Sequence, residues 1–370
     1  MSGARATYLD WNATAPVLPE AAAAMAEALT RCGNPSSVHR WGRAARQAVE
    51  AARRDVAALV GAAPQDILFT SSGSEANQTT LHGGRRPVLV SALEHDSVRA
   101  WPGASVIPAT LEGLVDLAAL DRMLAADVRP ALVSIMLANN ETGAIQPVVE
   151  AARIAHRYGA LFHSDAVQAA GKLPLAMAAL GADLMTLSAH KIGGPQGVGA
   201  LVVSPDLDLA PLIAGGGQEQ GRRAGTENVP GIVGFGGAAR RAAEGIADQA
   251  RIAALRDDAE RRLLALAPGA CVFAASVPRL ANTLCISMPG VPAATQVMAL
   301  DLAGVMVSAG AACSSGKLRR SPVLEAMGVP EAEADCAIRI SLGWSTGQAD
   351  IDHLVEAWGA LYVRTRNEAA

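Results

Sequence analysis

Residues 184–199 read LMTLSAHKIGGPQGVG, an apolar run that continues into the polar tetrapeptide Ser-Ala-His-Lys and then into a glycine-rich turn. The short apolar run at 184–188 predicts a buried strand. In an α/β protein, ligands bind beyond the carboxyl ends of such strands. We therefore expect Lys191 to lie at the ligand-binding edge of a sheet.

Short apolar runs of the same kind recur through the first two hundred residues, and alanine-rich amphipathic stretches alternate with them. That alternation predicts an α/β fold in which helices cover a mostly parallel sheet. Helical periodicity returns at residues 238–266, and later strand-like runs predict a smaller α+β domain. We place the large domain at residues 16–264 and the small domain at residues 1–15 and 265–370. The remaining runs are 67–70, 88–91, 131–136, 160–163 and 200–203 (strands), 19–29 and 44–60 (helices), and 284–288 and 337–341 (strands of the small domain).

Composition and charge exclude several classes of protein. Of the 370 residues, 51% are hydrophobic and 18% are charged, which excludes intrinsic disorder. The formal net charge is −4, so the chain lacks the excess of positive charge that binding to a nucleic-acid backbone requires. The charge-free stretch 280–300 is interrupted by Pro289, Gly290 and Pro292, and the first residues lack a signal-peptide pattern, so we expect no membrane span and no export. Five cysteines without CxxC spacing predict no disulfide framework and no cysteine-based metal site, which favours the cytoplasm.

Polar residues follow further predicted strands. Residues 71–77, Ser-Ser-Gly-Ser-Glu-Ala-Asn, open a helix with small residues whose free N–H groups can bind an anion. Taken alone, this motif is more simply an ordinary serine N-cap. Polar side chains also occur at the other predicted strand ends: the imidazole of His95, the amides of Asn140 and Gln168, and the carboxylate of Asp165. Together they predict a polar ligand site.

Lysine is rare in this chain, because only Lys172, Lys191 and Lys317 occur among 31 basic residues. A solvated loop side chain would explain a single lysine. Lys191, however, lies at a strand end beside Ser188 and His190, and arginine cannot form the Schiff base that a lysine amine forms. An amine, a carboxylate and a phosphate cradle are what pyridoxal 5′-phosphate requires.

Two residues of the second half also indicate chemistry. Cys313 lies among small residues in 308–317, where a free cysteine can be an exposed nucleophile, whereas the other four cysteines fit buried small side chains. Arg339 is a charge within the apolar run 337–341. It is either an arginine on a solvent-facing edge strand or a clamp for a substrate carboxylate.

Taken together, these motifs resemble the cysteine desulfurases of the NifS/IscS type, in the class V aminotransferase family of fold-type I pyridoxal-phosphate enzymes. The resemblance covers nearly the whole chain. It rests on motifs that occur in family order: Asn-Asn-Glu-Thr-Gly at 139–143, His-Ser-Asp-Ala-Val-Gln at 163–168, Ser-Ala-His-Lys at 188–191, Arg-Arg-Ala-Gly-Thr-Glu-Asn at 222–228 and Ala-Ala-Cys-Ser-Ser-Gly at 311–316.

The resemblance implies a role for each matching residue. The cofactor would be held covalently by Lys191, at its ring nitrogen by Asp165, and on its ring face by His95, which would also move protons. The ring hydroxyl would be bound by Gln168 and Asn140, and the phosphate by Gly73, Ser74, Ser188, His190 and, from the second subunit of a homodimer, Thr226. The substrate L-cysteine would be bound by Arg339, Asn34 and Asn140. Its sulfur would pass to Cys313 as a persulfide, and then to an acceptor such as an iron–sulfur scaffold or a tRNA-thiolation protein.

Several alternatives remain open at this stage. Selenocysteine lysis or transamination could occur on the same scaffold. The pattern His163, Asp165 and distant His353 formally matches the ligand set of an iron(II) oxygenase, although the alternating α/β pattern counts against that fold. The segment Leu-Arg-Arg-Ser-Pro at 318–322 departs from the family pattern after the cysteine, so partner contacts there do not follow from the resemblance.

Overall fold

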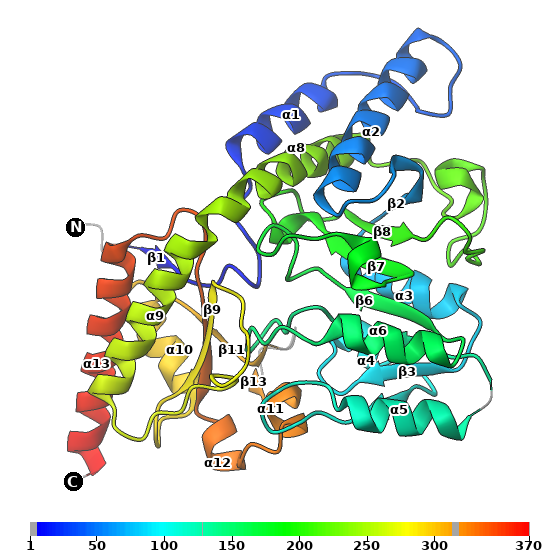
Figure 1. The fold of residues 1–370 in the computed structure, drawn as a ribbon. Coiled ribbons are helices and arrows are strands. Elements are labelled where there is room, and N and C mark those ends of the chain that lie inside the picture. The colour runs from blue at the N-terminus through cyan, green and yellow to red at the C-terminus, as the bar shows by residue number, and fades with distance from the viewer. Residues whose placement is uncertain (1–5, 128, 313–317, 370) are drawn as a thin grey trace.

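A seven-stranded sheet forms the centre of the larger lobe in the computed structural model, which describes residues 6–127, 129–312 and 318–369 (Figure 1). The strand order is β2-β8-β7-β6-β5-β3-β4, and β8 alone runs antiparallel to the other strands of this sheet. The predicted α/β fold with a mostly parallel sheet is therefore confirmed. The strands are β2 (Ile67–Thr70), β3 (Val88–Ser91), β4 (Ser105–Ile107), β5 (Leu132–Ser134), β6 (Leu161–Asp165), β7 (Leu184–Ser188) and β8 (Gly199–Val203).

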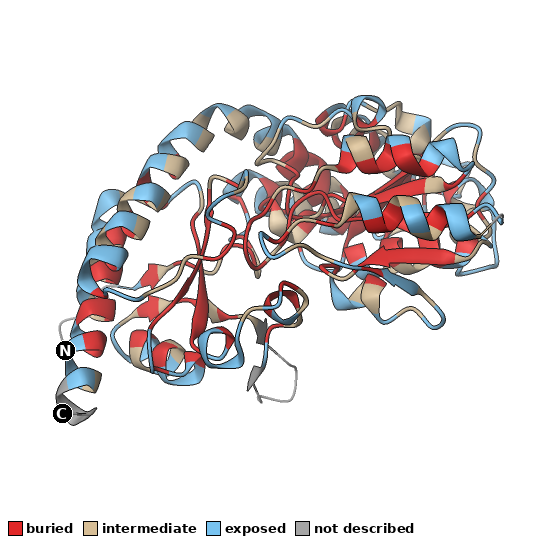
Figure 2. Ribbon diagram, turned by 60° about the horizontal axis from the view of Figure 1, so that its bottom comes forward, coloured by how far each residue is buried: buried red, intermediate tan, exposed pale blue. Residues whose placement is uncertain are grey.

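Helices cover both faces of this sheet because its strands are apolar on both sides, as is usual for parallel strands. Alternate strand residues enter two different cores: Phe69 and Met185 pack in one, and Leu68 and Leu184 in the other. Figure 2 shows the buried strands between helices whose outer faces are exposed. The first core takes residues from α1 (Pro19–Leu29), α2 (Arg40–Leu59), α5 (Leu117–Ala126), α6 (Val148–Arg157), α7 (Met177–Leu180) and α8 (Val229–Gly245), and the second takes residues from α3 (Gly73–Gly83) and α4 (Asp96–Arg99).

A three-stranded antiparallel sheet with the order β11-β14-β9 forms the smaller lobe. The N-terminal segment belongs to this lobe, because β1 pairs with β10 and Leu9 packs in the same core as Trp358. β12 and β13 form a separate antiparallel pair. The elements are β1 (Thr7–Tyr8), β9 (Thr283–Ser287), β10 (Val305–Met306), β11 (Ser308–Ala309), β12 (Ala311–Ala312), β13 (Leu318–Arg319), β14 (Ala337–Ser341), α9 (Gln249–Leu266), α10 (Ala293–Leu302), α11 (Pro322–Ala326), α12 (Glu331–Ala334) and α13 (Gln348–Ala369).

Helix α9 packs with the smaller lobe, beside α13 (Figure 1). Its residues Ile252, Leu255 and Leu263 enter the core that contains Leu9, whereas Phe235 of α8 enters the core of the large sheet. The helical periodicity is continuous across α8 and α9, so the sequence does not indicate that the two helices pack in different cores. We therefore propose that the domain boundary lies near residues 246–248, ahead of α9 and not at residue 265.

Strands β6 and β7 end at Asp165 and Ser188, and both ends face the smaller lobe. The residues that follow them thus meet side chains of β14, as the cavity described below shows. Within the described ranges, no helix has the length and apolar character needed to cross a membrane.

Candidate active site

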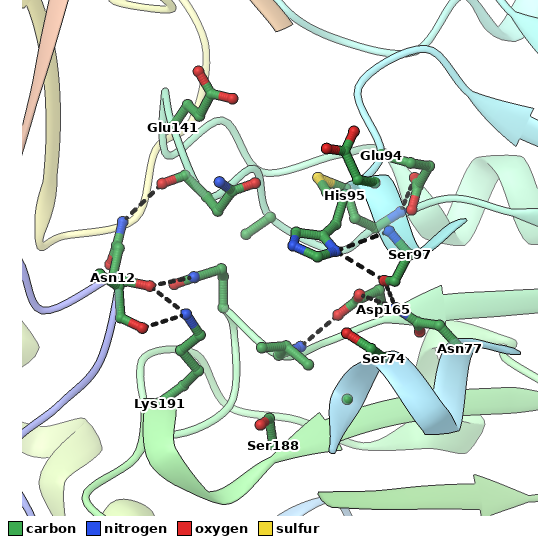
Figure 3. Close-up of a pocket in the computed structure, with 18 of the residues that line it drawn as sticks. Asn12, Ser74, Asn77, Glu94, His95, Ser97, Glu141, Asp165, Ser188 and Lys191 are labelled. Atoms are coloured by element: carbon green, nitrogen blue, oxygen red, sulfur yellow. Dashed lines mark hydrogen bonds between the residues drawn. The ribbon is translucent and has the colours of Figure 1, made fainter. Parts of the chain in front are cut away.

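A cavity of about 400 Å³ lies at the carboxyl ends of the large-sheet strands, where the smaller lobe covers them (Figure 3). The structure brings ten of the predicted site residues together in its lining: Gly73, Ser74, His95, Asn140, Asp165, Gln168, Ser188, His190, Lys191 and Arg339. These residues come from six separate segments of the chain, including the first turn of α3. The arrangement agrees with the expectation that polar residues after the strands share one edge of the sheet.

The Lys191 amine lies inside this cavity. β7 ends at Ser188, and a single 3₁₀ turn, Ala189–Lys191, carries the side chain inward. Its Nζ donates to the backbone carbonyls of Asn12 and Ala13, at 2.6 and 2.7 Å. Burial and the nearby Arg339 guanidinium lower the pKa of the Lys191 amine from 10.5 to about 8. The amine is therefore neutral far more often at neutral pH than an ordinary lysine.

The Asp165 carboxylate is fixed at the end of β6. Oδ1 accepts from the backbone N–H of Val167 at 2.9 Å, and Oδ2 accepts from Nδ2 of Asn77 at 2.8 Å. The side chain is only 7% exposed, so two donors hold it in one orientation. A buried carboxylate that points into a cavity is suited to pair with a protonated ring nitrogen.

An anion cradle forms where β2 turns into α3. Ser72 caps this helix by accepting from the Glu75 N–H at 3.1 Å, and Gly73 brings the backbone so close to Val167 that a Cβ would lie 3.1 Å from its Cγ2. Because the Glu75 and Ala76 N–H groups both bond to Ser72, the N–H groups of Gly73 and Ser74 are the ones that can bind a phosphate. Burial, and then the nearby Lys191, lower the pKa of His190 to about 4, so this imidazole is neutral and donates one N–H.

His95 precedes α4 and is held by Ser97. Its Nδ1 accepts from the Ser97 N–H at 3.1 Å and lies 2.8 Å from the Ser97 hydroxyl (Figure 3). Because Nδ1 is an acceptor, the proton of the neutral imidazole is on Nε2. Nε2 is then the ring atom that can exchange a proton with a ligand.

Arg339 is 5% exposed and lies on β14, the central strand of the small sheet, so the interpretation as a solvent-facing edge residue is wrong. One nitrogen donates to Asp10 at 2.7 Å and another to the Asn140 carbonyl at 3.2 Å. Nε is buried and has no partner among the described residues. This guanidinium therefore keeps a hydrogen bond for a ligand.

Of the three remaining predicted residues, two lie outside this cavity and one lies outside the described residues. Asn34 is exposed in the loop after α1, where its side-chain oxygen accepts from the Ser36 N–H at 2.9 Å. Thr226 is exposed ahead of α8. Cys313 lies outside the described residues. The roles of all three remain predictions.

The oxygenase alternative is wrong. His163 is buried in the sheet with Nδ1 and Nε2 at 2.8 and 3.0 Å from hydroxyls of Ser134 and Thr186, and His353 contacts Thr7 in the small lobe. Among the described residues, no group of three histidines, cysteines or carboxylates could hold a metal ion.

Sequence reasoning missed several residues of the cavity. Asn12, from the N-terminal segment, contacts Lys191 and Gln168 through its backbone oxygen. Asn77 holds Asp165, and its position one helical turn after Gly73 was the available signal. Glu94 lies beside His95 in sequence. Burial raises the pKa of its carboxyl well above the usual value, and Oε1 accepts from the Met136 N–H.

Pyridoxal 5′-phosphate fits these residues. An amine of lowered pKa, a fixed carboxylate, an imidazole with a free Nε2 and a helix N-terminus flanked by Ser74 and Ser188 line one cavity. In addition, Asn77 Oδ1 and Arg339 Nε are buried polar atoms without a partner among the described residues. A ligand with several polar groups would satisfy them.

Comparison with known proteins gives consistent matches. The family model "Aminotransferase class-V" matches residues 7–354. A cysteine desulfurase from Cereibacter sphaeroides is 46% identical and covers 94% of this chain and 94% of its own. One from Gluconacetobacter diazotrophicus is 41% identical, with 98% and 94% covered. The crystal structure of a NifS-like protein from Rickettsia africae superposes with a TM-score of 0.90 at 37% identity, covering 97% of this chain and 99% of that chain.

Proposed function

Because the chain belongs to the class V aminotransferase family and is a cysteine desulfurase, we propose that the cavity binds pyridoxal 5′-phosphate through Lys191 and acts there on L-cysteine. A structure described as "SspA in complex with cysteine", which superposes with a TM-score of 0.78 at 29% identity, supports this substrate. The observation that carries the proposal is the placement of Lys191, Asp165, His95 and the α3 N-terminus around one cavity.

The bound cofactor supplies an electron sink for the substrate α-carbon. Asp165 keeps the ring nitrogen protonated, because its carboxylate is fixed by Asn77 and Val167 and cannot turn away. Ser74, Ser188 and neutral His190 donate to the phosphate, together with the open N–H groups of α3. Gln168 and Asn140 bind the ring hydroxyl side.

Different residues orient the substrate and move its proton. Arg339 binds the carboxylate of L-cysteine, since its Nε is unpartnered and Asp10 fixes the other end of the guanidinium. Asn140, whose carbonyl accepts from Arg339, also lines the carboxylate site. Asn34 lies outside this cavity in the described chain, so its part in substrate binding stays a prediction from the resemblance. The Lys191 amine and His95 Nε2 would hold and transfer the α-proton.

Cys313 is the proposed nucleophile that removes the sulfur from L-cysteine. Its thiolate attacks the sulfur of the substrate, a new S–S bond forms, the carbon–sulfur bond breaks, and its electron pair is taken up by the carbon, which is then protonated to give L-alanine. The persulfide on Cys313 is passed to an acceptor protein, such as an iron–sulfur scaffold or a tRNA-thiolation protein, in the cytoplasm.

Borohydride reduction tests the covalent site. We expect reduction of the yellow holoprotein to fix the cofactor on Lys191, and peptide mapping by mass spectrometry to find it there. Lys172 is the informative control, because its amine also has a lowered pKa, about 7, through burial and the proximity of Lys191 and Arg339. A cofactor mapped to Lys172 or Lys317 would overturn the assignment.

We further propose that the protein is a homodimer in which Thr226 of one subunit reaches the phosphate of the other. In the described chain Thr226 is exposed and outside the cavity, but its loop is firmly held: Arg53 pairs with Glu219, and Arg223 pairs with Glu75 of α3, at 2.8 and 2.9 Å. Loops so fixed can present a side chain across an interface.

Sedimentation tests the dimer. We expect the holoprotein to sediment as a dimer, and Thr226→Val to bind the cofactor roughly fivefold more weakly through the loss of one hydrogen bond. Thr14→Val is the control for loss of a threonine hydroxyl within one chain. That hydroxyl lies 3.3 Å from Nδ1 of His190 in the same subunit, so its effect does not depend on the dimer. An active monomer would exclude the role of Thr226.

A further inference from the structure

We infer that Lys172 is a positioning residue of the active site, which fixes the side-chain amide of Gln168 so that its N–H group faces the cofactor. The inference rests on the proposed function, because it assumes that a cofactor occupies the cavity that Gln168 lines. Lys172 follows Gln168 by four residues, in the turns after β6, and it lines a second cavity that shares Lys191 with the cavity lined by Gln168.

The contacts of Lys172 are specific. Its Nζ lies 2.9 Å from Oδ1 of Asn12 and 2.9 Å from Oε1 of Gln168. Both partners are amide oxygens, which only accept, so Nζ donates in both bonds. A side chain that merely filled space would not need an amine between two acceptors.

These bonds decide how the Gln168 amide is turned. The amide oxygen faces Lys172, and Nε2 donates to the backbone carbonyl of Asn12 at 2.9 Å. Nε2 carries two hydrogens, so one remains for the ring oxygen of the cofactor. If the amide turned over, its oxygen would face that ring oxygen, and two acceptors would repel each other.

The effect of Lys172 falls on Gln168 more than on Asn12. Oδ1 of Asn12 has a second donor, Nδ2 of Asn282 at 3.0 Å, and Nδ2 of Asn12 donates to Thr283 at 2.8 Å. For Oε1 of Gln168, Lys172 is the donor found in the described part of the chain. Without Lys172, Asn12 stays held, whereas Gln168 keeps only the bond from its Nε2 to the Asn12 carbonyl, and its oxygen loses the donor that holds it away from the cofactor.

A double-mutant cycle on the holoprotein tests the inference. The variants are Lys172→Met, Gln168→Leu and the combination, and two quantities are measured: the dissociation constant of pyridoxal phosphate and the pH midpoint of the cofactor absorbance change. We expect each single variant to weaken cofactor binding roughly fivefold, the effect of one hydrogen bond. We also expect an upward shift of the midpoint, because a donor beside the ring oxygen stabilises its anionic form.

The decisive result is the double variant. If Lys172 acts through Gln168, Lys172→Met adds nothing once Gln168 is leucine. If the Lys172 charge instead acted directly on Lys191, Lys172→Met would change cofactor binding and the pH midpoint by the same amount with Gln168 present or replaced. The charged groups around Lys191, which are Arg339, Asp10 and Asp165, are unchanged in both backgrounds. Additive effects, or a Lys172→Met protein with the parent's binding and midpoint, would overturn the inference.

Lys172→Arg is the matched control for folding and packing. A cavity of about 190 Å³ borders Lys172 and can take the longer side chain, and the guanidinium restores N–H donors toward Gln168. We expect it to recover most of the cofactor affinity that methionine loses. A parent protein that never binds pyridoxal phosphate would refute the proposed function, whereas a yellow parent with additive variants would refute only the role of Lys172.

Discussion

Asp165→Asn is expected to bind the cofactor and to lose α-proton exchange by roughly a hundredfold or more, the scale on which a fixed electrostatic group contributes to catalysis. The physical reason is the loss of a negative charge that keeps the ring nitrogen protonated. The amide also disturbs the local hydrogen bonds. Val167 N–H and Asn77 Nδ2 both donate to Asp165, so the NH₂ group of an asparagine would face one donor.

The measurement is deuterium incorporation at the α-carbon of L-alanine, followed by NMR, because this exchange needs no sulfur chemistry. Asp165→Glu, which keeps the charge at a shifted position, is the control and should lose less. Asn77→Leu separates positioning from charge, since it removes one donor and leaves the carboxylate. Undiminished exchange in Asp165→Asn would refute the role of this residue.

The large sheet could be predicted in detail because its strands are short apolar runs with clear ends. Residues 67–70, 88–91 and 184–188 of the prediction coincide with β2, β3 and β7. The strand β4, Ser105–Ile107, was not predicted, because it is an edge strand whose first two residues are exposed. The change of core between α8 and α9 was also missed, since it depends on tertiary packing and not on periodicity.

The site could be predicted where topology alone brings residues together. Asp165 and Lys191 follow neighbouring parallel strands, so their proximity follows from the sheet. Asn12 and Lys172 could not be found in this way. The contact of Asn12 with Lys191 depends on how the N-terminal segment packs between the lobes, and no periodic pattern encodes that.

Removing the thiol of Cys313 is expected to separate the carbon chemistry from the sulfur chemistry. A serine hydroxyl stays protonated near neutral pH and is a poor nucleophile toward sulfur, whereas a thiol of pKa ~8.5 is already a few per cent thiolate. Cys313→Ser should therefore stay yellow, change its spectrum when L-cysteine is added, and still exchange the α-proton. Its production of L-alanine should fall by at least about a hundredfold, because the nucleophile of the sulfur step is missing.

The other cysteines serve as controls for this experiment. Cys285 and Cys336 are buried, and burial raises the pKa of both thiols, so they are poor substitutes for a thiolate. Cys32 is exposed and Cys271 is half-buried, so the expectation of four buried cysteines is wrong for these two. Because Cys32 is not part of the cavity lining, Cys32→Ser should keep the parent's rate. In the parent, a trapped persulfide should map to Cys313 by mass spectrometry. If Cys313→Ser formed alanine as fast as the parent, another nucleophile would take the sulfur from the substrate, and the role of Cys313 in the sulfur step would be refuted.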